Sequence, residues 1–221
     1  MKNGFSIAWK TAAAALVSYS LVAGLMSPVP RLFILNETIR NLYFHVPMWF
    51  TMVALMGVSL GYSIGSLRKP GISALESDRK ARLAAEVALV FAFLGLFTGM
   101  IWARFTWGAY WTNDPKLNGT AVAILIYLAY FVLRSSVEDP EKKARLASTY
   151  NVFAFVLMIV FIGVLPRLTD SLHPGNGGNP AFGSYDLDNG MRAVFYPAVF
   201  GWIGLGVWIV ELRDRLARLS K

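Results

Sequence analysis

Six long apolar runs, separated by shorter polar stretches, dominate the pattern of this sequence. Each run approaches the ~20 residues that a helix needs to cross a bilayer. None of them has the strict alternation of a membrane β-strand, so we expect helices. The expected spans are 9–26, 46–67, 83–102, 117–133, 148–165 and 193–212. The pattern predicts an all-α, polytopic membrane protein in which residues 1–221 form one domain, a bundle of six transmembrane helices.

Composition agrees with this prediction. The chain is 56% hydrophobic and 15% charged, whereas soluble domains carry roughly 25% charged residues. The first run leads into "SPVPRLF". This stretch lacks a small-x-small cleavage pattern, so we expect the first run to remain as a span in the lipid bilayer.

The distribution of the basic residues orients the bundle. Of the 21 Lys and Arg residues, 15 fall in the two terminal segments and the two loops on the same side, and six fall in the other three loops. Cytoplasmic loops carry the excess of positive charge, so we expect both termini to be cytoplasmic. The basic residues behind the net charge of +8 therefore orient the bundle through their uneven distribution. The sequence has no nucleic-acid motif, and we expect no nucleic-acid partner.

The three loops expected on the outer side are 27–45, 103–116 and 166–192, and they hold the unusual residues. The third loop is long for a helix–helix connection and rich in glycine. It is either a mobile tether or a gate or docking surface.

Two features of the spans concern helix packing. Glycines recur at four-residue spacing on the second and third spans: Gly57, Gly61, Gly65, Gly95 and Gly99. Small residues at this spacing predict close helix approach in lipid. Glu86 follows Arg82 by four residues, and we expect the two to form an ion pair near the membrane interface.

The loop "FTWGAYWTND" carries more aromatic side chains than a short turn needs. Its aromatic residues and closing acid are Phe105, Trp107, Tyr110, Trp111 and Asp114. Trp and Tyr gather at membrane interfaces in any case, but an interfacial belt explains four aromatics in seven residues less well. A flat apolar ligand that stacks on these rings is the alternative.

The chain has two histidines, His45 and His173, and no cysteine. Both histidines are expected on the outer side, flanking the aromatic loop in sequence. A single histidine at a membrane interface is usually only a polar residue at the end of a helix. Together, however, the two could bind a metal from opposite sides through neutral ring nitrogens. Haem is flat and apolar with two propionates, which Arg40 and Arg104 could pair bidentately. Without cysteine there is no thiolate ligand and no C-x-x-C-H haem-attachment signature.

The segments "IRNLYFHVPMW" and "IWARFTWGAYWTNDPKL" and the later "LH" resemble the cytochrome c maturation protein C family, also called haem exporter protein C. This family belongs to the haem-handling group marked by the tryptophan-rich WWD motif. The resemblance covers nearly the whole chain.

The resemblance implies a set of site residues. His45 and His173 match the two axial ligands of the haem iron. The core of the WWD motif is matched by Trp107, Gly108, Trp111 and Asp114. Tyr110 stands where Trp is frequent, and Asn113 departs from a further Trp directly before the aspartate. This departure puts the full stacking surface in question.

The resemblance also implies a role. Haem b is held non-covalently as cargo at the outer face of the cytoplasmic (inner) membrane and delivered to a membrane-tethered haem chaperone for c-type cytochrome biogenesis. Implied partners are the ATPase and membrane subunits of an ABC-like transporter and a small membrane peptide. The chain has no Gly-rich phosphate loop, so we expect a delivery component driven by partners rather than a typical enzyme.

Three alternatives stay open. A cytochrome c haem synthase of the same motif group would need further spans or larger outer domains. A b-type haem electron-transfer subunit usually places histidines centrally within its spans, and none of the expected spans has a central histidine. A solute permease would need midplane charges or paired broken helices.

Overall fold

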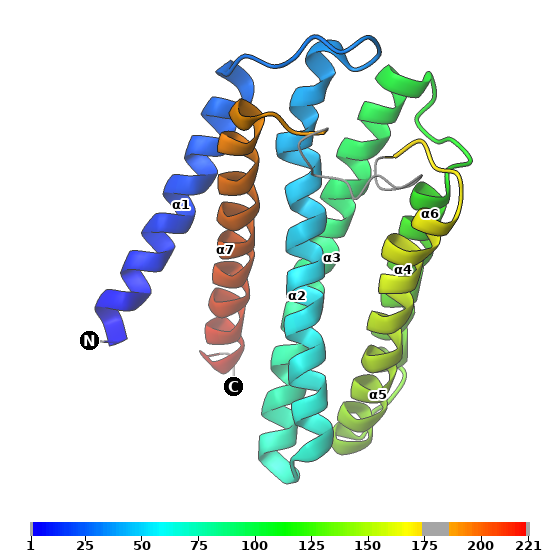
Figure 1. Ribbon diagram of the computed structural model, residues 1–221. Helices are drawn as coiled ribbons and strands as arrows, with labels where there is room; N and C mark the ends of the chain where they lie inside the picture. The colour runs from blue at the N-terminus through cyan, green and yellow to red at the C-terminus, as the bar shows by residue number, and fades with distance from the viewer. Residues whose placement is uncertain (1, 174–185, 220–221) are drawn as a thin grey trace.

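The computed structural model describes residues 2–173 and 186–219, and it is a bundle of long helices (Figure 1). The elements are α1 (Lys2–Met26), the 3₁₀ turn η1 (Asn36–Asn41), α2 (Leu42–Arg68), α3 (Gly71–Trp107), α4 (Pro115–Ser135), α5 (Pro140–Ile159), the π turn η2 (Val160–Val164), α6 (Leu165–Leu168) and α7 (Asn189–Leu219). Six helical segments are long and apolar enough to cross a membrane. The prediction of an all-α, six-span membrane protein is confirmed.

The start of α1 and the end of α7 lie at one end of the bundle, which we call the terminal end (Figure 1). The connections after α1 and α3, and residues 169–173 after α6, lie at the opposite end, which we call the loop end. The two ends of the chain therefore lie on the same side of the bundle, as the sequence predicts. Which face is cytoplasmic remains a prediction from charge.

α2 lies at the centre of the bundle. It packs against α3, α5 and α7, and α1 joins the bundle mainly through α7. The buried core includes Leu55, Met56, Phe91, Tyr127 and Met158. Lipid tails are as apolar as these side chains, so close packing and hydrogen bonds hold the helices together.

α3 is longer at both ends than the third predicted span, 83–102. α3 continues to Trp107 and ends at Gly108, which adopts the left-handed conformation with φ 81°. No Gly or Pro interrupts the preceding segment "IWARFTW", and left-handed backbone is strained for other residues. The outer loop predicted at 103–116 is thus a short link between α3 and α4.

The fifth predicted span is not one uninterrupted α-helix. α5 gives way to the π turn η2, and Pro166 follows in α6. Proline has no N–H to continue the α-helical ladder, and π turns accommodate such interruptions. The Arg167 guanidinium donates to the Gly163 carbonyl at 2.5 Å. On α4, Gly119 allows the turn to approach, since a Cβ there would lie 2.2 Å from the Phe161 oxygen.

Within the described residues, the glycine row of α2 makes no approach closer than ordinary contact: a Cβ at Gly65 would lie 3.7 Å from the Ser77 hydroxyl oxygen on α3. A Cβ at Gly57 would find its nearest neighbour, Phe155, at 4.0 Å, and one at Gly61 would meet nothing within 4 Å. Four-residue spacing alone does not reveal which face of a helix meets a partner. The predicted pair of Glu86 with Arg82 is confirmed, and Arg213 also approaches Glu86, at 2.8 Å.

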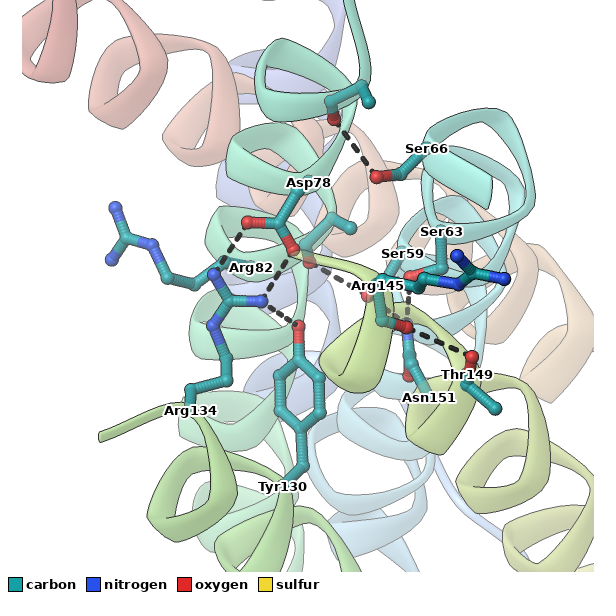
Figure 2. A network of polar contacts seen from close by, with 12 residues as sticks. Ser59, Ser63, Ser66, Asp78, Arg82, Tyr130, Arg134, Arg145, Thr149 and Asn151 are labelled. Carbon is teal, nitrogen blue, oxygen red and sulfur yellow. Dashed lines mark hydrogen bonds and ion pairs between the residues drawn. The ribbon is translucent and has the colours of Figure 1, made fainter. Parts of the chain in front are cut away.

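A buried polar cluster joins four helices toward the terminal end (Figure 2). The Arg134 guanidinium donates to both oxygens of Asp78, at 2.6 and 2.7 Å, and to the Tyr130 hydroxyl at 3.3 Å. Nearby, the Asn151 amide donates to Ser59 and Ser63, both at 2.8 Å. These contacts tie α4 to α3 and α5 to α2 where water is excluded.

Breaking the buried ion pair should be more damaging than removing it. Arg134→Met or Asp78→Asn leaves one partner uncompensated, so we expect a loss of about 3–5 kcal/mol of stability. The double variant Asp78→Leu/Arg134→Met should recover most of that loss. Unfolding in detergent, followed by circular dichroism, measures the differences. Glu37→Gln, in an exposed ion pair, is the control and should cost about 1 kcal/mol or less. Single variants as stable as this control would contradict the assignment.

Candidate functional site

His45 lies in the first turns of α2 and is held by α3. Its Nδ1 lies 3.0 Å from the Gly95 carbonyl oxygen and 3.2 Å from the Thr98 hydroxyl. A carbonyl oxygen only accepts, so the ring proton belongs on Nδ1. Nε2 then carries the lone pair, which accepts from the Trp49 indole N–H at 3.3 Å.

The glycine row of α3 makes room for these two rings. A Cβ at Gly99 would lie 2.6 Å from His45 Cε1, and one at Gly95 would lie 2.7 Å from Trp49 Cε2. Both contacts are shorter than any side chain tolerates. The predicted close approach is confirmed on α3, where it seats an imidazole and an indole.

His173 follows α6 and is held by Asp114. Its Nδ1 lies 2.9 Å from Asp114 Oδ1, and the Trp107 ring packs edge-on against the imidazole at 4.9 Å. Asp114 Oδ2 accepts from the Ser171 hydroxyl at 2.8 Å and from the Leu172 N–H at 2.7 Å. The carboxylate thus fixes the segment that carries His173.

Asp114 is 2% exposed and also caps α4. Its Oδ1 accepts from the backbone N–H groups of Lys116 and Leu117, at 2.9 and 3.2 Å. Burial opposes ionisation of Asp114, but the hydrogen bonds from His173, Ser171 and Leu172 outweigh it and hold the pKa of the carboxyl below its usual range. An ionised carboxylate only accepts. The His173 proton therefore belongs on Nδ1, and Nε2 is the nitrogen left to bind a ligand.

His45 and His173 line one cavity of about 420 Å³. Its walls are mainly apolar and come from α2, α3, α4, α5, η2 and α6; they include Trp49, Phe50, Leu96, Trp102, Leu117, Ile159 and Ile162. Lys116 and Arg167 are the two cationic side chains in the lining. Small-molecule sites commonly span roughly 300–1,000 Å³ and combine apolar walls with a few placed polar groups.

Arg40 and Arg104, which the sequence suggested as partners of a carboxylate ligand, do not line this cavity. Arg40 donates to carbonyls at the end of α1, including that of Ser27, and to Glu37 at 2.8 Å. Arg104 donates to the Gly108 carbonyl just beyond the end of α3. Both guanidiniums secure helix ends at the loop end of the bundle.

Sequence reasoning missed Lys116 and Arg167. Lys116 lies in the first turn of α4, where the helix dipole disfavours a cation. That unfavourable placement was a usable signal. Arg167 lies in a four-residue helix after the π turn, and nothing in the sequence pattern points to it.

The aromatic loop contributes unequally. Trp107 contacts His173, while Tyr110 and Trp111 are 56% and 40% exposed and do not line the cavity. The Trp111 indole donates to Asn118 at 3.2 Å, and Asn118 donates to Asn113 at 2.8 Å. Asn113 therefore holds Asn118, the acceptor of the Trp111 N–H, by a hydrogen bond that a Trp at position 113 could not accept.

Six helices that can span a membrane, and an apolar cavity lined by two histidines and two cations at one end, define a multi-pass membrane protein with a cavity at the loop end. The sequence matches the heme exporter protein C family over residues 3–215. The chain therefore belongs to this family.

Three relatives named Heme exporter protein C illustrate the similarity. The protein of Paracoccus denitrificans is 29% identical over 224 residues, covering 98% of this chain and 88% of its own length. That of Escherichia coli K12 is 24% identical, with 81% and 70% covered. The protein of Bradyrhizobium diazoefficiens is 33% identical over 119 residues, covering 53% of this chain and 43% of its own length.

Asp114→Asn should release the His173 segment while leaving the bundle folded. The amide places an N–H₂ group where the carboxylate accepts donors, and we expect a loss of about 1–3 kcal/mol. Faster hydrogen exchange at the Leu172 amide checks this. Because the pKa of Asp114 is depressed, its contribution is present above the ordinary carboxyl pKa of about 4 and is lost as pH falls further. Asp170→Asn, at an exposed acid in the same segment, should change nothing; equal exchange in both variants would contradict the role of Asp114.

Proposed function

We propose that this protein binds haem b through His45 and His173 and delivers it to a membrane-tethered haem chaperone during c-type cytochrome biogenesis. The observation that carries the proposal is that the chain's two histidines line one cavity, each with its Nδ1 within hydrogen-bond distance of an acceptor oxygen. Orientation of both rings through Nδ1 prepares Nε2 for a metal. Family membership supports haem as the ligand.

The cavity suits the other parts of haem as well. Its apolar wall, with Trp49, Phe50 and Trp102, offers surfaces for the macrocycle, and aromatic rings pack well on flat π systems. Lys116 and Arg167 offer two cations for the two propionates. These cations replace Arg40 and Arg104 in our proposal, since only Lys116 and Arg167 border the cavity.

The loop end is the proposed site of hand-over. The excess of Lys and Arg at the terminal end favours a cytoplasmic terminal end, so the cavity would face the outer side of the cytoplasmic membrane. Tyr110 and Trp111 expose aromatic surface beside the cavity and suit contact with an incoming partner. We propose that ABC-like ATPase and membrane subunits and a small membrane peptide act with this chain, which positions the cargo and leaves the chemistry to its partners.

Loss of either histidine should change the absorption spectrum of the haem-loaded protein. We expect the wild type to show six-coordinate, low-spin haem, and His45→Ala and His173→Ala each to lose this signature because no third histidine can substitute. Added imidazole should restore it in both variants, which a merely structural role would not predict. Spectra of protein purified with haem in detergent are the measurement.

Two arginine variants provide a matched control for the same spectra. Arg167→Gln removes a cation from the cavity and should weaken haem binding by about tenfold, as expected for a lost charge-assisted hydrogen bond. Arg104→Gln removes a cation at the same end of the bundle and should bind as the wild type does. In the preceding experiment, an unchanged spectrum of His45→Ala or His173→Ala would contradict ligation by that histidine.

Hand-over should depend on Tyr110 and Trp111, the exposed aromatic side chains of the link between α3 and α4. Trp111→Ala removes aromatic surface outside the cavity, so we expect the protein to keep its haem but load the chaperone more slowly. Phe105→Ala, at a more exposed aromatic on the last turns of α3, is the control and should load normally. Co-expression with the chaperone and haem staining of both proteins measure the transfer. Normal loading by Trp111→Ala, or loading without this protein, would contradict the delivery role.

A further inference from the structure

The lone pair of His45 Nε2 already has a partner within the protein. The Trp49 indole N–H donates to it at 3.3 Å, and the rings meet nearly perpendicularly at 79°. Trp49 lies one turn after His45 on α2. Its indole packs against Gly95 on α3, where a side chain would collide with it. The hydrogen bond between Trp49 and His45 therefore joins two rings whose positions are fixed by packing against Gly95 and Gly99.

A metal bond and this hydrogen bond use the same lone pair. His45 Nδ1 carries the proton because it faces the Gly95 carbonyl, so Nε2 has the ring's one available lone pair. A bond from Nε2 to iron requires the Trp49 N–H to leave it. Conversely, when an iron–nitrogen bond breaks, the indole N–H is at hand to bind Nε2.

The two histidines differ in this respect. His173 is oriented by a carboxylate, and its Nε2 makes no hydrogen bond to any of residues 2–173 and 186–219, which the structure describes. A carboxylate on Nδ1 also makes an imidazole a better donor to metal than a carbonyl does. His173 is the stronger ligand by both arguments, and His45 is the weaker.

We infer that the Trp49 indole competes with the haem iron for His45 Nε2 and makes His45 the axial ligand that is released first during hand-over. This inference rests on the proposed function. It assigns Trp49 as a positioning residue whose N–H lowers the affinity for cargo that must be passed on. A carrier that binds its cargo too tightly would not release it.

Trp102 offers a matched control inside the same cavity. Its ring packs against His45 nearly as the Trp49 ring does, with centroids 5.9 Å apart at 76°. Its N–H, however, donates to the Thr38 hydroxyl at 3.2 Å. Trp49→Phe and Trp102→Phe thus remove similar packing, and only the first removes a donor from Nε2.

The first measurement needs no haem. Diethyl pyrocarbonate modifies neutral imidazole nitrogens, and mass spectrometry can follow His45 and His173 separately. We expect Trp49→Phe to raise the rate at His45 several-fold relative to His173, and Trp102→Phe to leave that ratio unchanged. Gly95→Ala, whose Cβ would displace the indole, should act as Trp49→Phe does and serves if that variant folds poorly.

The second measurement is haem loss to excess apomyoglobin. Because one hydrogen bond typically contributes about 0.5–1.5 kcal/mol, Trp49→Phe should slow haem loss by about fivefold. Trp102→Phe removes aromatic wall without freeing His45 Nε2 and should therefore release haem faster than the wild type. The six-coordinate spectrum should persist in both variants.

The outcomes separate this inference from the proposed function. An unchanged His45 rate in Trp49→Phe, or equal haem loss from the two Trp variants with intact spectra, would overturn the role of Trp49 and leave ligation by the histidines standing. A wild-type protein that binds no haem, or binds it without His45, would overturn the proposed function and this inference together.

Discussion

The buried carboxylate of Asp114 is the contact on which the arrangement of the loop end depends. Its two oxygens accept from the first turn of α4, from the Ser171 hydroxyl, from the Leu172 N–H and from the His173 ring. A buried charge is tolerable only when it is hydrogen-bonded on this scale. One side chain thereby fixes the aromatic loop, a helix start and the segment after α6 in a single geometry.

The two ends of the bundle meet different physical demands. Toward the terminal end, the Asp78–Arg134 pair and the Asn151 bonds clamp α3 to α4 and α2 to α5 (Figure 2). Toward the loop end, η2 interrupts the α-helical course of the fifth span beside the cavity, and its Ile162 and Gly163 are part of the lining. The polar contacts hold the helices together toward the terminal end, and the π turn η2 leaves space for an apolar cavity toward the loop end.

The histidines are controlled by different partners because they occupy different structures. His45 is on a long helix against α3, where the acceptor available is a backbone carbonyl. His173 is in an irregular segment, where its orientation depends on a carboxylate from another loop. The same Nδ1 tautomer results in both cases, but with unequal donor strength. This asymmetry suits a proposed cargo that has to be held and then released.

The sequence by itself determined the number and type of spans, because a helix that crosses lipid must be long and apolar whatever its neighbours are. It also drew attention to His45, His173 and the aromatic loop, because rare residue types near the ends of apolar runs are visible without a structure. It did not show that α3 continues to Trp107 or that η2 interrupts the fifth span, since these depend on a glycine φ angle and on how closely Gly119 meets Phe161. It named Arg40 and Arg104, which do not line the cavity, and not Lys116 and Arg167, which do, because nearness along the chain does not show which side chains border a cavity. Only the tertiary structure decided that Asp114 reaches 59 positions along the chain to His173 and that Gly95 and Gly99 seat Trp49 and His45. Such contacts join different helices, and spacing along one helix contains no information about the partner it will meet.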